Sequence, residues 1–306
     1  MSNIQVLLVA GTHGNEINAP WVFDQWEQNP ELLEKNGLQV IPVIGNPIAL
    51  EKCQRYLQRD LNRSFTPEFL NSSKFTDLEI SRAKYLFELY GPKGKSSSQI
   101  VIDFHSTTSC MGTSLVIYGR RPADLALASL IQNRIGLPVY LYEGDSSQKG
   151  FLVEAWPCGF VVEIGPVPQG SLNSRIIKQT FLTLKICLEE ISKSITGKSC
   201  FPENLIVHRH LKSIDFPRDS SGKPIAFIHG DLEGRDWQTI TQEYPLFEDL
   251  KGEIVRLSDY SCQDEVVPVF VNEAAYTEKN IAMSLTKREV WTFDENWKDA
   301  FYELIT

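Results

Sequence analysis

His13 and Glu16 stand three residues apart in the stretch LLVAGTHGNEINAP, directly after an apolar run near the N-terminus. Catalytic zinc sites commonly combine two histidines with one carboxylate and leave a fourth position for water, so this pair could supply two of the three ligands. The spacing alone is weak evidence. A structural histidine, followed by a carboxylate in the first turn of a helix, would give the same pattern.

Polar residues also end two later apolar stretches, VIDFH and FVVEIG. Asp103 and His105 close the first stretch, and Glu163 closes the second. In open α/β sheets ligands bind beyond the carboxyl ends of the strands, so these residues are expected to gather there with the His13–Glu16 pair. His13, Glu16 and His105 would then provide two histidines and one carboxylate to a metal.

Glu163 is the most informative of these residues. A carboxylate at the end of an apolar strand is costly to bury unless it is paired, protonated or in use. It could form an ion pair with an arginine; beside a metal-activated water it would be a general base, and later an acid for the leaving group. Asp103 lies two residues before His105, on the same strand face, and we expect it to orient a metal ligand.

The elements that must place these residues alternate along the first two-thirds of the chain. Short strands rich in Val and Ile, without polar alternation, are separated by helical patterns, which is typical of an α/β fold with a mostly parallel sheet flanked by helices. The expected strands cover residues 4–10, 38–45, 99–105, 114–119 and 159–165. The expected helices cover residues 17–29, 76–91, 121–136 and 171–194.

The pattern changes after residues 195–205, ITGKSCFPENL, to short alternating stretches with turn signals. We therefore expect a catalytic α/β domain over residues 1–203 and a smaller β-rich domain over residues 204–306 that covers the active-site cleft. His208 and His210 would share one face of a strand there. Because no third ligand is evident, we expect an exposed strand face rather than a second metal site.

Composition limits the partners and the compartment. The chain has 306 residues, of which 42% are hydrophobic, and a formal net charge of −9, which argues against nucleic acid or an anionic membrane as the main partner. The apolar run at the N-terminus is too short to span a membrane, and we expect a cytoplasmic protein. Six scattered cysteines without a CxxC pair indicate reduced thiols rather than a disulfide framework.

Six stretches, in order along nearly the whole chain, resemble the aspartoacylase and succinylglutamate desuccinylase family of the zinc carboxypeptidase-like superfamily. They are GTHGNE, GNPIAL followed by CQRYLQRDLNRSF, DFHSTTSCMG, VEIGPVPQG, DFPRD and PVFVNEAAYTEK. The resemblance implies one Zn²⁺ per subunit, held by His13, Glu16 and His105, with Glu163 as catalytic base and acid. It also implies hydrolysis of a small anionic N-acyl amino acid, typically N-acetyl-L-aspartate to acetate and L-aspartate, by a homodimer.

The resemblance assigns further roles to four residues. It makes Arg55 the catalytic group that polarises the scissile carbonyl, and Asn62 and Arg63 the binders of a substrate carboxylate. Tyr276 would reach the same pocket from the C-terminal domain. From spacing alone, the arginines fit a solvated helix face about as well as a site for planar carboxylates, and Tyr276 fits an ordinary surface or core tyrosine.

One departure from the family pattern concerns the substrate side chain. Aspartoacylases usually carry an arginine ahead of the catalytic glutamate, but no arginine occurs here between Arg134 and Arg175, and Lys149 is the one cation in that stretch. Either Lys149 or a more distant residue substitutes, or the enzyme does not select aspartate. The alternatives are a deacylase for another N-acyl amino acid, a carboxypeptidase, and a non-catalytic zinc-binding module.

Overall fold

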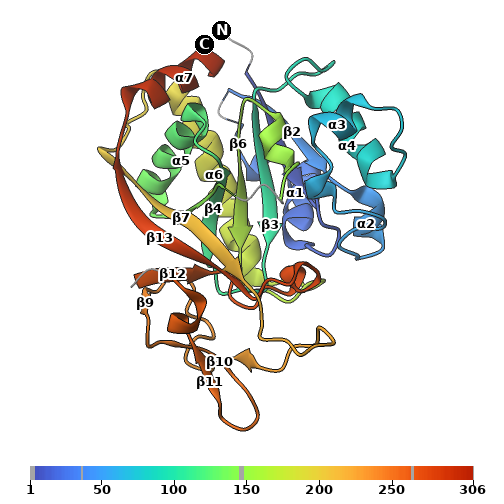
Figure 1. The fold of residues 1–306 in the computed structure, drawn as a ribbon. Helices are drawn as coiled ribbons and strands as arrows, with labels where there is room; N and C mark the ends of the chain where they lie inside the picture. The colour runs from blue at the N-terminus through green and yellow to red at the C-terminus, as the bar shows by residue number, and fades with distance from the viewer. Residues whose placement is uncertain (1–3, 36, 145–147, 263–264, 306) are drawn as a thin grey trace.

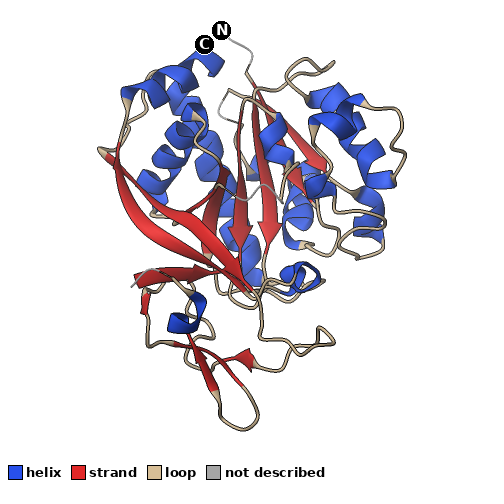
Figure 2. Ribbon diagram, viewed as in Figure 1, coloured by secondary structure: helices blue, strands red, loops and turns tan. Residues whose placement is uncertain are grey.

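The apolar stretches of the sequence form the strands of one large sheet in the computed structural model, which describes residues 4–35, 37–144, 148–262 and 265–305 (Figures 1 and 2). In spatial order its strands are β2 (Gln39–Ile44), β1 (Gln5–Ala10), β3 (Ile100–Ser106), β6 (Cys158–Ile164), β4 (Thr113–Tyr118), β5 (Val139–Tyr142), β7 (Asn204–Ile214), β13 (Met283–Thr292), β12 (Glu265–Val269) and β9 (Ile240–Thr241).

Strand direction decides where the polar strand ends meet. β2, β1, β3 and β6 are mutually parallel, so their carboxyl ends lie at one edge of the sheet. β4 runs antiparallel to β6, and β5 and β7 continue parallel to β4. β13, β12 and β9 complete the sheet with antiparallel pairs. The expected mostly parallel, mixed sheet is confirmed; the short strand β5 was not among the predicted elements.

Helices cover both faces of the sheet, as the pattern predicts. Leu8, Ile102 and Phe160 are buried on one face with α1 (Asn18–Gln28), α5 (Pro122–Ile135), α6 (Ser174–Ile195) and α7 (Glu295–Ile305). Leu7 and Val101 are buried on the other face with α4 (Leu78–Tyr90), η2 (Leu61–Arg63) and η3 (Leu152–Ala155). Burial of each such side chain stabilises the fold by roughly 1.5–3 kcal/mol, which holds the strand ends in place. The remaining short helices are η1 (Pro30–Leu32), α2 (Pro47–Glu51) and α3 (Pro67–Asn71).

The C-terminal part has a small core and a sheet of its own. β11 (Ile254–Arg256), β10 (Pro245–Glu248) and β8 (Phe227–Ile228) form a three-stranded antiparallel sheet. The short helix η4 (Leu257–Tyr260) connects β11 to β12 of the large sheet, and η5 (Ala274–Lys279) connects β12 to β13. Leu246, Phe247 and Met283 belong to a hydrophobic core separate from the two cores beside the large sheet. The expected smaller β-rich C-terminal domain is confirmed.

The two parts of the chain are joined through the large sheet. β7 pairs with β5, β13 pairs with β7, and α7 returns to pack against α5 and α6. Figure 1 shows β7 and β13 as long strands that reach from the helical layer to the small sheet around β10 and β11. We propose a domain boundary between residues 203 and 204. The large sheet continues across this boundary.

Two expectations from composition can be compared with the structure. All six cysteines are free thiols. Among the described residues, no helix combines the length and the apolar character needed to cross a membrane.

Candidate active site

The turn between β1 and α1 brings His13 and Glu16 to the carboxyl edge of the sheet. Gly11 has a φ of +66°, a left-handed conformation that favours glycine. Gly14 is required for a different reason, because a Cβ there would lie 2.1 Å from the backbone carbon of Ala49 in α2. Its amide donates to the backbone carbonyl of Arg55 at 3.1 Å. The turn is thus fixed against the loop that follows α2.

The three predicted metal ligands converge. One nitrogen or oxygen atom from each of His13, Glu16 and His105 lies within 4.8 Å of the other two. The Nδ1 atoms of the two histidines are 3.1 Å apart, and the Glu16 carboxylate oxygens lie 2.7 Å from His13 Nδ1 and 3.0 Å from His105 Nδ1. Ligands around one tetrahedral zinc, with bonds of about 2 Å, would be roughly 3.3 Å apart, so the donor set fits zinc.

Two carboxylates determine which nitrogen of each histidine faces this set. His13 Nε2 lies 3.0 Å from Asp60 Oδ1, and His105 Nε2 lies 2.8 Å from Asp103 Oδ2. A proton on each Nε2 satisfies these contacts and leaves both Nδ1 lone pairs free for a metal. Asp103 therefore orients His105, as a positioning group for a ligand should. Its other oxygen accepts from the Thr12 hydroxyl at 2.8 Å.

Glu163 lies beside this set on the neighbouring strand. Its register partner is His105, so the two side chains leave β6 and β3 on the same face. Burial raises the pKa of Glu163 to about 8, and the Glu16 and Glu273 carboxylates act in the same direction. Glu16 behaves in the opposite way: burial would raise its pKa, but His13 and His105 hold it well below the usual value.

The loop after α2 supplies the arginine. Arg55 directs Nη1 toward Glu16 at 3.4 Å and Nη2 toward Asp60 at 3.5 Å, and its buried Nε has no hydrogen-bond partner in the described part of the chain. Burial opposes the charge, but Asp60 and Glu16 raise the pKa of Arg55, so its guanidinium stays protonated. Arg55 therefore presents a fixed positive charge beside the predicted metal ligands.

Asn62 and Arg63 follow on η2, which Asp60 begins by accepting from the Asn62 amide at 2.9 Å. The Asn62 carbonyl oxygen accepts from Leu152 N at 2.8 Å, which fixes the orientation of its amide. Arg63 donates from Nη1 to the Asn62 backbone carbonyl at 2.8 Å and from Nη2 to Gln148 Oε1 at 2.7 Å. Both acceptors are neutral, and none of the described carboxylates forms an ion pair with Arg63.

The predicted site residues line one cavity of about 40 Å³. They are His13, Glu16, Arg55, Asn62, Arg63, His105, Glu163 and Tyr276. Tyr276 comes from η5 in the C-terminal part, and burial raises the pKa of its hydroxyl well above the usual value. A second cavity, of about 30 Å³, shares Arg63, Glu163 and Tyr276 with the first and extends between aromatic rings.

Glu273 joins the C-terminal part to the loop that follows His105. It is 5% exposed, and its Oε2 accepts from the hydroxyl of Thr107, from Thr108 N at 2.8 Å and from Ser109 N at 3.2 Å. It also begins η5 by accepting from the Ala275 amide. One carboxylate thus fixes the helix that carries Tyr276 against the loop that follows His105.

Several contributors could not be found from the sequence. Asp60, Phe151 and Glu273 approach the site from separate parts of the chain, and no local motif marks their contacts. The one sequence signal for a further site residue was the position of Asp60 in QRDLNR, between the predicted site residues Arg55 and Asn62.

Lys149 and the two histidines of β7 lie away from the predicted metal ligands. Lys149 is exposed and lines neither cavity. The expectation of an exposed histidine face is wrong: His208 and His210 are 6% and 5% exposed. Trp237 of the C-terminal part covers His208, and Tyr140 of β5 contacts His210 Nδ1 at 2.9 Å, so both parts of the chain cover this face of β7. Among the described residues, only the His13 set could hold a metal.

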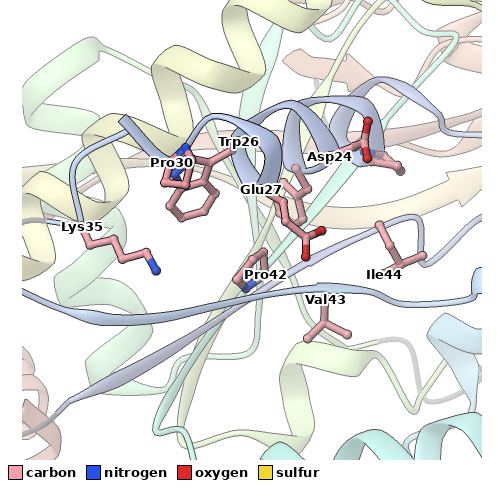
Figure 3. Close-up of a pocket in the computed structure, with 10 residues that line it drawn as sticks. Asp24, Trp26, Glu27, Pro30, Lys35, Pro42, Val43 and Ile44 are labelled. Atoms are coloured by element: carbon pink, nitrogen blue, oxygen red, sulfur yellow. The ribbon is translucent and has the colours of Figure 1, made fainter. Parts of the chain in front are cut away.

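A larger cavity of about 380 Å³ lies elsewhere, between α1 and β2 (Figure 3). Trp26, Pro42 and Lys35 line it, together with Asp24 and Glu27. The Lys35 ammonium lies 5.8 Å from the Trp26 ring centre. None of the predicted site residues is among its lining residues.

Two family models together match most of the chain. Residues 2–191 match the succinylglutamate desuccinylase/aspartoacylase catalytic domain, and residues 203–288 match the AstE/AspA barrel-sandwich hybrid domain. A protein of Prochlorococcus marinus described as "Probable aspartoacylase" is 60% identical over 100% of this chain and 99% of its own length. One from Synechococcus sp. with the same description is 51% identical over 100% and 99%.

A solved structure extends the likeness to three dimensions. The crystal structure of murine aminoacylase 3 is 32% identical and has a TM-score of 0.86, with 96% of this chain and 98% of that one covered. Family model, sequence relatives and fold agree over almost the whole chain. The chain therefore belongs to the succinylglutamate desuccinylase/aspartoacylase family of hydrolases.

Proposed function

We propose that this chain hydrolyses the amide bond of an N-acyl amino acid with one zinc ion per subunit. The observation that carries the proposal is the convergence of His13, Glu16 and His105 with Glu163 beside them on the adjacent strand. Two histidines, one carboxylate and a separate acid–base carboxyl are the parts that metal-assisted amide hydrolysis needs.

Each residue has a separate task in this proposal. Zinc, when bound, supplies Lewis-acid chemistry, which polarises a carbonyl and makes water a better nucleophile at neutral pH. The positive charge of a bound zinc would offset the burial that raises the pKa of Glu163, so that its carboxylate can take a proton from the attacking water and later deliver it to the departing amine nitrogen. Arg55 stabilises the negative charge that develops on the carbonyl oxygen, and its unpaired Nε is a donor that this oxygen can use.

The charge around Arg63 supports an anionic substrate. Its guanidinium is half-buried and lines both cavities, and its acceptors among the described residues are both neutral. A partly desolvated cation without a counter-ion is stabilised when a carboxylate binds beside it. We assign Arg63 and the Asn62 amide to the α-carboxylate of the N-acyl amino acid, with Tyr276 forming the adjoining wall.

The size of the site argues against the rival functions. The two cavities measure about 40 and 30 Å³, and Ala275 and Tyr276 of η5 close one side from the C-terminal part. A long peptide would require this wall to be absent, which disfavours a carboxypeptidase. A non-catalytic zinc-binding module has no use for a buried acid–base residue such as Glu163.

The first substrate to consider is N-acetyl-L-aspartate, which would give acetate and L-aspartate. The sequence resemblance and the description of the relatives as "Probable aspartoacylase" support it. Hydrolysis at a rate that requires both zinc and Glu163 is the expected result.

A second candidate is an N-acyl amino acid with an uncharged, ring-bearing side chain. The smaller cavity is lined by the rings of Tyr118, Tyr140, Tyr142, Phe151, Phe270 and Tyr276. Arg63 is the one cation among the described residues that line it. If Arg63 binds the α-carboxylate, no second cation is left there for the carboxylate of an aspartate side chain.

One experiment separates these possibilities. The zinc-loaded protein is assayed with N-acetyl-L-aspartate, with N-acetyl-L-asparagine as a neutral match of the same size, and with N-acetyl-L-phenylalanine, each beside Glu163→Ala. Preference for the aspartate compound over its asparagine match supports the first candidate, and preference for the phenylalanine compound supports the second. No turnover of any N-acyl amino acid by a folded, zinc-replete sample would refute the proposed function.

We also propose a homodimer and a cytoplasmic location, following the resemblance. Light scattering after size-exclusion chromatography tests the first, with a mass of twice 34.7 kDa expected. Fractionation of cells that express the chain tests the second.

A further inference from the structure

Glu79, in the first turn of α4, directs its carboxylate into the loop that carries Arg55. It is 1% exposed and belongs to neither cavity lining. Its Oε1 accepts from Leu57 N at 2.7 Å, and its Oε2 accepts from Gln58 N and Arg59 N, both at 3.2 Å. Three consecutive backbone amides of one loop therefore converge on a single buried carboxylate.

The remaining contact of Glu79 extends this anchor to α2. Asn46 Nδ2 donates to Glu79 Oε1 at 3.2 Å, while Asn46 Oδ1 accepts from Ala49 N to begin α2. In the described part of the chain the donors to Glu79 are neutral N–H groups, and Glu79 has no ion pair with Lys or Arg. A buried carboxylate satisfied only by amides loses its stabilisation if the loop changes conformation, because the unpaired charge would remain buried.

The anchored amides lie between two residues of the active site. Arg55 is two positions before Leu57, and its backbone carbonyl accepts from Gly14 N in the metal-ligand turn. Asp60 directly follows Arg59 and contacts His13 Nε2. The loop is thus held at its centre by Glu79 and near its ends by the turn that delivers His13.

Other contacts explain how α4 is attached to the sheet. Arg82 Nε donates to the Gly45 carbonyl and Arg82 Nη2 to the Ile44 carbonyl, both at 2.7 Å. Ile80 and Leu86 are buried against the domain. Within the described residues, Glu79 adds hydrogen bonds to the Arg55 loop and to Asn46 alone, which fits a role in placing that loop rather than in docking the helix.

We propose that Glu79 is a positioning residue that holds Arg55 in register with the metal ligands. This inference rests on the proposed function in so far as Arg55 acts on the substrate carbonyl. The carboxylate fixes the backbone of residues 57–59, and the short spacing to Arg55 transmits that constraint to the guanidinium. A displacement of about 1 Å at such a group can lower a rate by about 100-fold.

The kinetic test uses Glu79→Gln, which keeps the shape but removes the charge and one strong acceptor. We expect kcat to fall by about 10- to 100-fold, with KM and zinc content little changed. In an Arg55→Ala background the same substitution should change kcat/KM by less than about twofold, because its effect acts through Arg55. Glu88→Gln, an exposed glutamate on the same helix, is the matched control and should retain full activity.

Additive effects of Glu79→Gln and Arg55→Ala would overturn the proposal, as would full activity of Glu79→Gln. A purely structural role predicts a lower melting temperature with additive kinetics, so the double mutant separates the two cases. If Glu79→Gln does not fold, Asn46→Ser serves in its place. A serine can still begin α2, while the donor to Glu79 is lost.

A second measurement does not depend on catalysis. Hydrogen exchange of the metal-free protein should be about tenfold faster at residues 57–59 in Glu79→Gln than in the wild type, with the α4 core unchanged. Unchanged exchange in the loop would overturn the anchor. If the wild type hydrolyses no N-acyl amino acid, the proposed function fails, and this measurement alone decides whether Glu79 holds the loop.

Discussion

Asp103 and His105 stand two residues apart on β3, and the Oδ2 atom of Asp103 lies 2.8 Å from the Nε2 atom of His105. Both side chains are buried, at 0% and 3% exposure. The carboxylate holds the imidazole in one orientation and makes its Nδ1 atom a stronger ligand. Asp60 has the same relationship to His13, at 3.0 Å. Each histidine of the proposed zinc site thus has a buried carboxylate behind it.

Asp103→Asn should weaken zinc binding by about 10- to 100-fold, because the negative charge behind His105 is lost. Competition with a chromogenic chelator measures the zinc dissociation constant directly. Asp77→Asn removes a half-exposed carboxylate on the surface and should leave that constant unchanged. Equal zinc affinity in Asp103→Asn and the wild type would contradict the role given to Asp103.

Arg63→Ala should mainly raise KM, because the residue is assigned to the substrate carboxylate. Loss of one member of a buried charge pair costs roughly 2–5 kcal/mol of binding. Steady-state kinetics separate KM from kcat, and the zinc content should not change. Arg59→Ala, whose side chain is 40% exposed, is the control from the same loop. A fall in kcat alone would place Arg63 in the chemical step instead.

Metal removal should destabilise the wild type. Zinc bound at a thousandfold excess over its dissociation constant adds about 4 kcal/mol to the free energy of unfolding, so chelation should lower the melting temperature by several degrees. His13→Ala should melt at the same temperature with and without zinc. Differential scanning calorimetry of both proteins provides the comparison, and a zinc-dependent shift in His13→Ala would argue for a different ligand set.

Glu273→Gln should loosen the contact between η5 and the loop after His105. The buried carboxylate accepts from two backbone amides and a threonine hydroxyl of that loop, and weaker hydrogen bonds should cost about 1–3 kcal/mol of stability. Urea unfolding measures this loss. Activity should fall as well, since Tyr276 lies three residues further on. Glu253→Gln, exposed in the same part of the chain, should affect neither quantity.

His208 should make the fold less stable in mild acid. Burial and the Arg288 charge lower its pKa from 6.5 to about 4 in the folded protein. The unfolded chain therefore binds more protons between these values, and stability falls as the pH drops from about 6.5 to 4. Because one pKa unit corresponds to about 1.4 kcal/mol, the loss should be at most ~3 kcal/mol. Urea unfolding across this range should show a smaller loss for His208→Leu; parallel curves would contradict the assignment.

The sequence predicted those parts of the site that depend on strand ends. His13, His105 and Glu163 follow or end apolar strands, and parallel strands bring their carboxyl ends to one edge. Asp60 could not be placed, because its contact with His13 depends on how a 47-residue excursion returns to the site. The contact of Phe151, whose ring centre lies 3.9 Å from the Arg63 guanidinium carbon, could likewise not be predicted from the sequence.

The same distinction applies to the fold. Strands 4–10 and 99–105 were predicted from continuous apolar runs, which buried parallel strands produce. β5 was missed because Val139–Tyr142 has only four residues. The burial of His208 and His210 was predicted wrongly because alternation along a strand distinguishes its two faces, but does not reveal that another part of the chain covers the polar one.

The shared sheet has a consequence for how this protein can vary. β7 completes the edge of β5, and α7 covers α5, so a chain cut at residue 203 would expose a strand edge and an apolar helix face together. The C-terminal part is therefore not a module that can be exchanged freely between relatives to alter substrate choice. A recombinant protein that still folds must therefore take β7 and α7 from the same parent as the catalytic part that they complete. Viable crossover points are then confined to the loops inside the C-terminal part.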